Sequence, residues 1–163
     1  MSRGLNRTWQ QLILFGLLLT ADQLSKWWIE QQMPFFHYTV IPGFFDIVKA
    51  HNFGVAFSIF ADWDSAWRTN ILLGVTIGIA MVVVLWWWRE RNQSGVESWL
   101  LILILTGAIG NIWDRMQLGY VVDFIDWYVR IGGTEYHWPA FNIADACISV
   151  SVVLLVILSF RKS

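Results

Sequence analysis

Two aspartates in apolar surroundings are the residues of this sequence best suited to chemistry. Asp123 lies in the apolar run from Val121 to Ile125, and Asp145 lies near the start of a long apolar stretch, three residues after Asn142. Two carboxylates close together in a water-poor cavity cannot both ionise, so they share one proton. The ionised carboxylate then takes a proton from water while the neutral one polarises a peptide carbonyl. This pattern is typical of an aspartic peptidase.

The same residues also have structural interpretations. Asn142 and Asp145 are three apart and follow Pro139, so they can cap a helix and its first turn. At this stage the capping and catalytic interpretations are equally open. Asp123 can alternatively lie on the surface of a turn, although its apolar neighbours favour a buried position.

Other hydrolytic designs fit the sequence less well. There is no HExxH motif, and the spacing of His37, His51 and His137 suggests no ligand set, which argues against a zinc peptidase. Ser149 and Ser151 lie in an apolar stretch without a nearby histidine or lysine, which argues against a serine nucleophile. We therefore expect no metal site and no cofactor.

Four long apolar stretches must position these residues. The chain is 56% hydrophobic and 14% charged, whereas a soluble domain has about 25% charged residues. A helix of about 20 apolar residues crosses the hydrocarbon core of a bilayer. The sequence predicts such spans over about 9–29, 69–88, 99–116 and 141–160. We expect one integral membrane domain over residues 1–163, of the membrane all-α class with four transmembrane helices.

Basic residues indicate how this domain is oriented. Six of the 11 Lys and Arg residues flank one side of the predicted spans, at Arg3, Arg7, Arg89, Arg91, Arg161 and Lys162. The positive-inside rule then places both termini in the cytoplasm. The connections over about 31–68 and 117–140 lie outside, and their many aromatic residues predict a small β-rich or amphipathic lid on the membrane surface. A hairpin is expected around Pro42-Gly43. A net charge of -1 argues against nucleic acid as a partner.

Polar residues within the spans converge on one layer near the outer surface. Counted back from the outer ends of the spans at about 1.5 Å per residue, Asp22 lies roughly 10 Å deep, Asn111 roughly 8 Å and Asp145 roughly 6 Å. Asp22 and Lys26 are one helical turn apart, which favours a structural ion pair. Arg115 follows Asn111 by one turn and shares its helix face.

Two features of the spans are assigned no chemistry. Asp114, beside Arg115 at the end of the third span, is interpreted as a solvated residue. Gly74 and Gly78 in the second span are four apart, and they are interpreted as a site of close helix packing.

Five short blocks carry most of these polar residues, and they follow one another from the first span to the fourth. They are Asp22-Gln-Leu-Ser-Lys26, Asn52-Phe-Gly-Val-Ala-Phe-Ser58, Gly107-Ala-Ile-Gly-Asn-Ile-Trp-Asp-Arg115, Val121-Val-Asp-Phe-Ile125 and Phe141-Asn-Ile-Ala-Asp145. In order and spacing they resemble the lipoprotein signal peptidases, also called signal peptidase II. The chain departs from that pattern in residues 131–137, which lengthen the loop between the two aspartates.

The resemblance implies an aspartic endopeptidase (signal peptidase II) of the bacterial cytoplasmic membrane, with its active site on the outer side. Its substrates would be diacylglyceryl-modified prolipoproteins in the membrane lipid, cut just before the lipidated cysteine. It also implies inhibition by the cyclic peptide globomycin, and we expect a monomer.

The resemblance also assigns residues by motif. Asp123 and Asp145 match the family's catalytic pair. The family's supporting polar positions are matched by Asp22, Lys26, Asn52, Asn111, Arg115 and Asn142. Among these, Asn52 is expected to hold the lid backbone near Gly54 against the site.

Two alternatives come from other classes of protein. A small proton-coupled transporter would use the carboxylates as ion sites, but such sites lie near the midplane between repeated halves, and this chain shows neither feature. A non-catalytic membrane assembly factor would capture a partner with its aromatic lid, but it would not need the clustered Asn, Arg and Asp residues.

Overall fold

Four helices and a small sheet make up the computed structural model, which describes residues 2–54, 65–93 and 95–162. The elements are α1 (Ser2–Glu30), β1 (His37–Ile41), β2 (Phe45–Asn52), α2 (Ser65–Glu90), α3 (Glu97–Leu118), β3 (Val121–Ile131), β4 (Thr134–His137) and α4 (Ile143–Lys162). The helices are long and apolar enough to cross a membrane over Arg7–Glu30, Thr69–Glu90, Glu97–Leu118 and Ile143–Arg161. The four predicted membrane helices are thus confirmed. The last residues of the Asn52 to Ser58 block lie outside the described residues.

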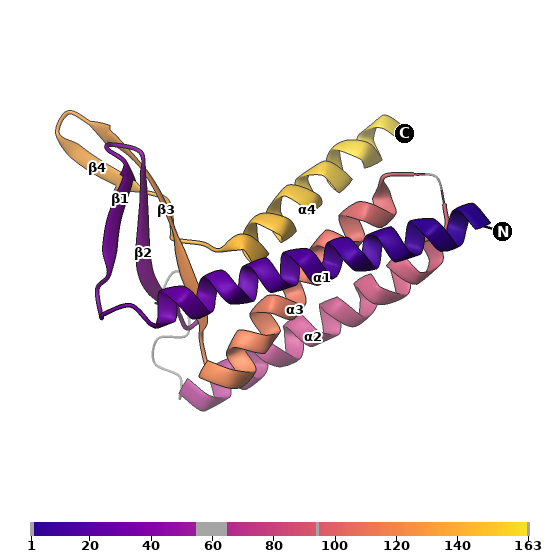
Figure 1. Ribbon diagram of the computed structural model, residues 1–163, viewed down its shortest axis with the longest axis horizontal. Helices are drawn as coiled ribbons and strands as arrows, with labels where there is room; N and C mark the ends of the chain where they lie inside the picture. Colours follow the sequence, from indigo (N-terminus) through magenta and orange to yellow (C-terminus); the bar gives the residue numbers. More distant parts are fainter. Residues whose placement is uncertain (1, 55–64, 94, 163) are drawn as a thin grey trace.

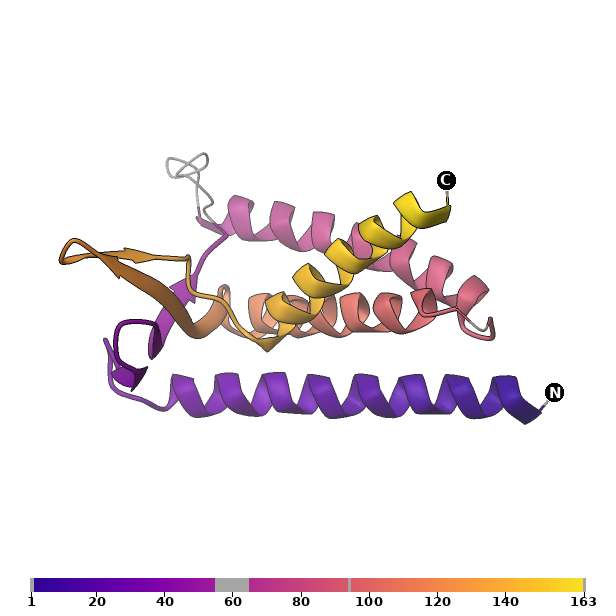
Figure 2. The ribbon, with the colours of Figure 1, turned by 90° about the horizontal axis from the view of Figure 1, so that it is seen from above.

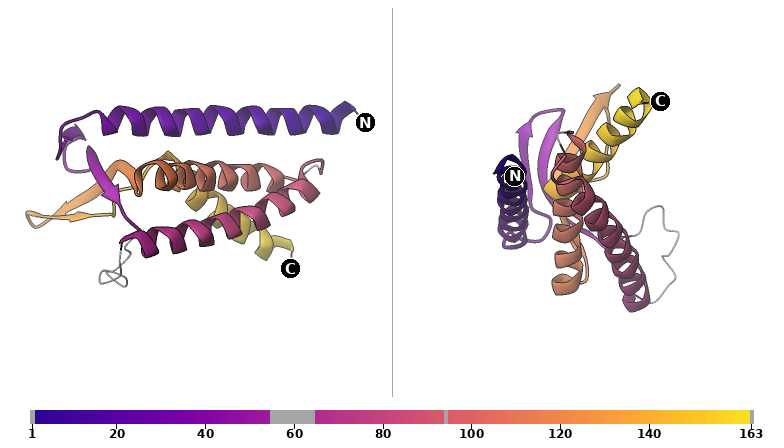
Figure 3. Two further views of the ribbon diagram at one scale, coloured as in Figure 1. Left: turned by 90° about the horizontal axis from the view of Figure 1, so that it is seen from below. Right: turned by 90° about the vertical axis from the view of Figure 1, so that its right-hand side faces the viewer.

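The central helix of the bundle is α3. In its most apolar window 61% of residues are buried, whereas the corresponding share is 17% or less in each of the other three helices. Figure 2 shows α3 between α1 and α2, with α4 starting beside α3 and diverging from it. The strands gather at one end of the bundle, and both termini lie at the other (Figures 1 and 3). Polar residues on α3 can therefore meet groups from every other helix.

Glycines on α3 allow its neighbours to come close. A Cβ at Gly107 would lie 2.2 Å from the backbone oxygen of Ala144 in α4, and one at Gly110 would lie 2.6 Å from Oδ2 of Asp22 in α1. The interpretation of Gly74 and Gly78 as close-packing residues is wrong within this chain, because a Cβ at either meets no atom within 4 Å. Both glycines lie on α2 and face open space.

The sheet has the antiparallel order β1-β2-β3-β4. Its first two strands form the hairpin predicted around Pro42-Gly43. The long strand β3 was predicted only as an apolar run, and β4 was not predicted at all. Val122 and Phe124 of β3 are buried against Ile29, near the end of α1. Since side chains alternate along a strand, Asp123 between them points to the other face, toward the start of α4.

The close approach of α3 and α4 gives the first testable prediction. Gly107→Ala places a methyl group against the Ala144 backbone, so we expect the free energy of unfolding to fall by about 2 kcal/mol, as is typical of overpacking. Gly78→Ala is the matched control, since its methyl group enters open space and alanine favours helix. Thermal unfolding in detergent measures both. Equal stability of the two variants would contradict the packing described.

Candidate active site

Asp123 is held by two asparagines from different elements. Its exposed fraction is 2%. Asn142 donates through Nδ2 to Oδ1 of Asp123 at 2.7 Å, and Asn52, the last residue of β2, donates through Nδ2 to Oδ2 at 2.9 Å. Both oxygens of this buried carboxyl group therefore have an amide donor. The side chain is fixed in direction by the strand that carries it and by the end of the neighbouring strand.

Asp145 lies in the first turn of α4 and is oriented by the cap of that helix. Its backbone N donates to Oδ1 of Asn142 at 2.9 Å, and the backbone N of Asn142 donates to Oδ2 of Asp145 at 3.4 Å. This reciprocal arrangement is a capping box, so the capping interpretation of the pair is confirmed. Asn111 of α3 donates through Nδ2 to the other oxygen at 2.7 Å.

Asn142 brings the two aspartates to one site, because it contacts both of them while fully buried. The capping and catalytic interpretations, left open by the sequence, are compatible. The cap is what directs Asp145 toward the space beside Asp123.

The two carboxyl groups interact electrically. Burial and, second, the charge of the nearby Asp145 carboxylate together raise the pKa of Asp123 from 3.8 to about 7. The amide donors of Asn52 and Asn142 and the charge of Lys26 act in the opposite direction, but they do not prevail. Asp123 therefore holds a proton below about pH 7. The cause is the one expected for two acids in a poorly hydrated site.

Lys26 of α1 is the cation beneath the site, and its exposed fraction is 2%. Its Nζ lies 2.9 Å from Oδ2 of Asp22 and 2.9 Å from Oδ2 of Asp114. Its third contact is Oδ1 of Asn111, also at 2.9 Å. Because the side-chain oxygen of Asn111 accepts from Lys26, the side-chain NH2 group of Asn111 is turned toward Asp145. Lys26 thus orients a donor to a proposed catalytic carboxylate without touching that carboxylate.

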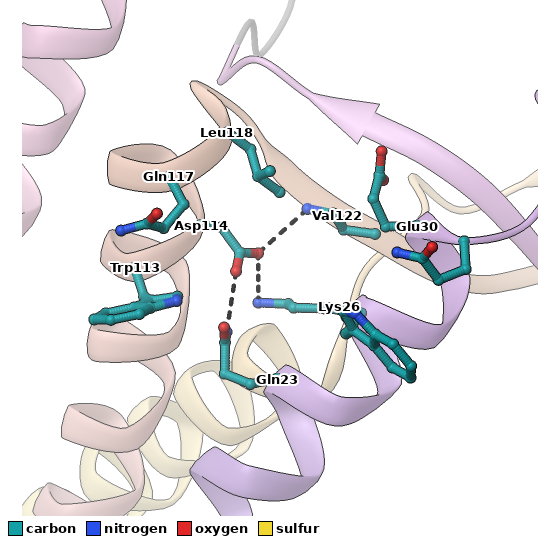
Figure 4. A pocket seen from close by; sticks show the side chains of 10 residues that line it. Gln23, Lys26, Glu30, Trp113, Asp114, Gln117, Leu118 and Val122 are labelled. Atoms are coloured by element: carbon teal, nitrogen blue, oxygen red, sulfur yellow. Dashed lines mark hydrogen bonds and ion pairs between the residues drawn. The ribbon is translucent and has the colours of Figure 1, made fainter.

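Asp114 is buried, with an exposed fraction of 3%, so its interpretation as a solvated residue is wrong. It accepts from Gln23 Nε2 at 3.0 Å and from the backbone N of Val122 at 3.3 Å, in addition to its ion pair with Lys26 (Figure 4). Its position three residues after Asn111 was the available signal, because that spacing puts both residues on one helix face. Asp114 ties the start of β3 to α1.

Asp22 forms the predicted ion pair with Lys26, and it also reaches the start of α4. Its Oδ1 accepts from the backbone N of Ala144 at 2.9 Å. That amide belongs to the first turn of α4, whose N–H groups lack partners within the helix. Asp22 therefore fixes the position of the turn that carries Asp145.

Gly54 and Arg115 lie close to the same residues. Gly54 has a φ of 76°, and a Cβ there would lie 2.1 Å from Cδ1 of Leu72. Its backbone N donates to Oδ1 of Asn52 at 2.8 Å, which turns the amide group of Asn52 toward Asp123. Arg115 contacts the backbone oxygen of Asn111 at 3.4 Å and lies within electrostatic range of both aspartates. The predicted site residues are all brought to one end of the bundle.

Two cavities adjoin this network. One, of about 440 Å³, lies beside Asp145 and is lined by Trp127, Trp138, Phe141, Asp145, Ala146, Ser149 and Val150. The other, of about 240 Å³, lies between α1 and α3 and is lined in part by Lys26 and Asp114 (Figure 4). The aromatic wall of the first was missed from the sequence, because it depends on how β3 folds back toward α4. Within the described ranges, the His, Cys, Asp and Glu residues form no group of three suited to a metal ion.

Comparisons with known proteins identify the family of this chain. Residues 14–161 match the family model described as signal peptidase (SPase) II. The chain belongs to the signal peptidase II family. This signal peptidase II family member is an aspartic peptidase with several membrane-spanning helices.

Similar proteins and structures cover nearly the whole chain. The lipoprotein signal peptidase of Solibacter usitatus is 40% identical over 150 residues, 91% of this chain and 89% of the relative. That of Alteromonas mediterranea is 36% identical over 162 residues, 98% of this chain and 82% of the relative. A solved structure described as a bacterial membrane enzyme, obtained by the in meso method, is 28% identical with a TM-score of 0.79, covering 94% of this chain and 88% of that one.

The Asp22 contacts give the second prediction. Asp22→Ala removes a partner of buried Lys26 and the acceptor of the Ala144 amide. We expect the free energy of unfolding to fall by about 3 kcal/mol, the cost typical of breaking a buried ion pair. Folded yield and turnover per folded molecule are measured together, with exposed Gln117→Ala as the control. Normal yield with lost turnover would instead place Asp22 in the chemistry.

Proposed function

We propose that this chain cleaves the signal peptide from diacylglyceryl-modified prolipoproteins just before the lipidated cysteine, with Asp123 and Asp145 as its catalytic pair. The observation that carries the proposal is the contact of one buried asparagine, Asn142, with both aspartates. Family membership and relatives named lipoprotein signal peptidases support the substrate class.

The proposed reaction divides the work according to the surroundings of the two acids. Asp145 lines the larger cavity and, ionised, takes a proton from a water molecule as that water attacks the scissile carbonyl carbon. Asp123, whose pKa is raised to about 7, gives its proton to the carbonyl oxygen. When the C–N bond breaks, Asp145 returns its proton to the leaving nitrogen and the diol returns one to Asp123. The pair then again holds a single proton.

The supporting residues are proposed to hold these groups and the substrate. Asn52 and Asn142 fix Asp123, and Asn111 fixes Asp145. Arg115 is proposed to bind a carbonyl of the extended substrate chain, which suits a guanidinium with several donors. Gly54 keeps Asn52 in place. Because the substrate is anchored by its lipid in the same bilayer, proximity is provided before any specific contact forms.

We further propose that the chain is one domain in the bacterial cytoplasmic membrane, with both termini in the cytoplasm and the site on the outer side. Basic residues cluster near the start of α1 and near the ends of α2 and α4, and Figure 1 shows that these helix ends lie opposite the sheet. This distribution supports the orientation. The sheet would then lie as a lid on the outer membrane surface. A monomer holds every proposed site residue, and globomycin is proposed to occupy the substrate site.

The test of the function is cleavage of a diacylglyceryl prolipoprotein by the purified protein. We expect Asp123→Asn and Asp145→Asn each to lower kcat by at least about a thousandfold, because neither the water nor the carbonyl is then activated. Both variants should still bind globomycin. Asp126→Asn is the matched control, since Asp126 is another buried acid of β3 but pairs with His137.

The control variant Asp126→Asn should keep most of its cleavage activity. Normal cleavage by either Asp123→Asn or Asp145→Asn would remove that residue from the pair. A chelator should leave cleavage unchanged, and loss that is restored by added metal would contradict the proposed chemistry.

The raised pKa of Asp123 gives a prediction about pH. The raised value means that the catalytic proton is present below about pH 7 and is lost above it, so kcat/KM should fall as pH rises through that value. Asn52→Ala removes a donor that stabilises the ionised form, so this decline should move to higher pH. The measurement is the pH profile of kcat/KM for both proteins. An unmoved or lowered midpoint in Asn52→Ala would contradict the assignment to Asp123.

A further inference from the structure

The cavity beside Asp145 has an aromatic wall formed by Trp127, Trp138 and Phe141. Trp127 lies between two rings, stacked on Phe44 at 6.2 Å and edge-on to Phe141 at 5.0 Å between centroids. Phe141 is held to β3 by hydrogen bonds with Ile125 in both directions, at 2.8 and 3.1 Å. The backbone N of Trp138 donates to the oxygen of Trp127 at 2.8 Å. These contacts place the rings of Trp127 and Phe141 and the backbone of Trp138 on one side of the cavity.

The opposite side of the cavity is a face of α4 that leads away from Asp145. Ala146, Ser149 and Val150 line it. From Asp145 to Val150 the helix advances about 7.5 Å at 1.5 Å per residue. This direction leads into the apolar span, and the exposed fraction of Val150 is 56%, so the inner end of the cavity is open to lipid. The cavity is therefore a slot that runs from the carboxylate into the bilayer.

Besides Asp145, Ser149 is the only lining residue with a hydrophilic side chain among the described residues that line this slot. We propose that the slot binds one acyl chain of the lipidated cysteine, and that Trp138 and Val150 determine which chains fit. This inference rests on the proposed function. The cleaved bond directly precedes the lipidated residue, so the lipid begins within a few bonds of Asp145. An acyl chain that starts near Asp145 and continues into the bilayer would follow the same path as the slot, which also runs from Asp145 into the bilayer.

The position of the slot favours one of the two apolar parts of the substrate. The slot begins at Asp145, and the lipid is attached to the residue directly after the cleaved bond, whereas the apolar segment of a signal peptide is separated from that bond by the cleavage-site residues. A single acyl chain is also thin enough to lie between the aromatic wall and α4.

The contact between the acyl chain and the slot would help the reaction by positioning the substrate rather than by adding binding energy. An acyl chain is already in an apolar medium in the bilayer, so moving it into the slot gains little hydrophobic free energy. Fixing its first carbons beside Asp145 instead restricts where the adjoining peptide bond can lie, and such restriction accelerates a reaction. The contact should thus affect kcat/KM for long chains and matter little for chains that end before Val150.

The test compares two lipopeptides of one sequence, carrying either two hexadecanoyl or two butanoyl chains. Val150→Trp fills the inner part of the slot, so kcat/KM for the hexadecanoyl substrate should fall about tenfold, and that for the butanoyl substrate should change less than about twofold. Val152→Trp is the matched control: Val152 is also exposed on α4, but its side chain is separated from that of Val150 by about 160° around the helix axis. It should cleave both substrates normally.

Equal behaviour of the two tryptophan variants, or equal loss on both substrates in Val150→Trp, would overturn the slot. Those results leave the proposed function intact as long as the unsubstituted protein cleaves and Asp123→Asn does not. Conversely, cleavage by Asp123→Asn would contradict the proposed catalytic pair. The comparison of hexadecanoyl and butanoyl substrates would still test the slot.

A second measurement does not depend on the folding of Val150→Trp. A photoreactive group is placed on the acyl chain of the lipopeptide, which is bound uncut to Asp123→Asn in detergent. Mass spectrometry should find adducts on Trp138, Ala146, Ser149 or Val150. Adducts confined to α1 or α2 would overturn the proposal.

Discussion

The contact of Asn142 with both aspartates is the interaction on which the rest of the structure depends. Its amide group donates to Asp123, and its side-chain oxygen caps the helix that carries Asp145. A fully buried asparagine has few alternative partners, so both acids are fixed relative to one side chain rather than to two independent elements. A strand and a helix that meet only at this end of the bundle can therefore hold the two carboxyl groups in one place.

The ionic layer beneath the acids explains why the asparagines keep their orientation. Lys26 is buried with two carboxylates, Asp22 and Asp114, and such a group is costly unless its hydrogen bonds are complete. Its remaining donor goes to Asn111, which settles the direction of that amide. The glycines of α3 make the layer possible, because Gly110 leaves room for Asp22. The ion pairs of Lys26, the close packing at Gly110 and the orientation of the Asn111 amide therefore depend on one another.

The features that depend only on residues near one another in the sequence were predictable. Hydropathy indicated four membrane helices, and helical spacing indicated the pair of Asp22 and Lys26. The burial of Asp114 was not predictable from composition, because it results from the approach of α1 to α3. Likewise, the aromatic wall of the slot forms only when β3, which carries Trp127, comes to lie beside the start of α4. Close packing was assigned to the wrong helix because a glycine pattern does not show which face has a neighbour.

The central claim is that Asp123 and Asp145 share one proton near neutral pH. Difference infrared spectroscopy of the carboxyl groups, recorded across a pH titration, tests it most directly. We expect a protonated carboxyl band that disappears as pH rises through about 7, and that is missing from Asp123→Asn. A band that persists unchanged in Asp123→Asn, or a spectrum with Asp123 already ionised well below that pH, would contradict the account.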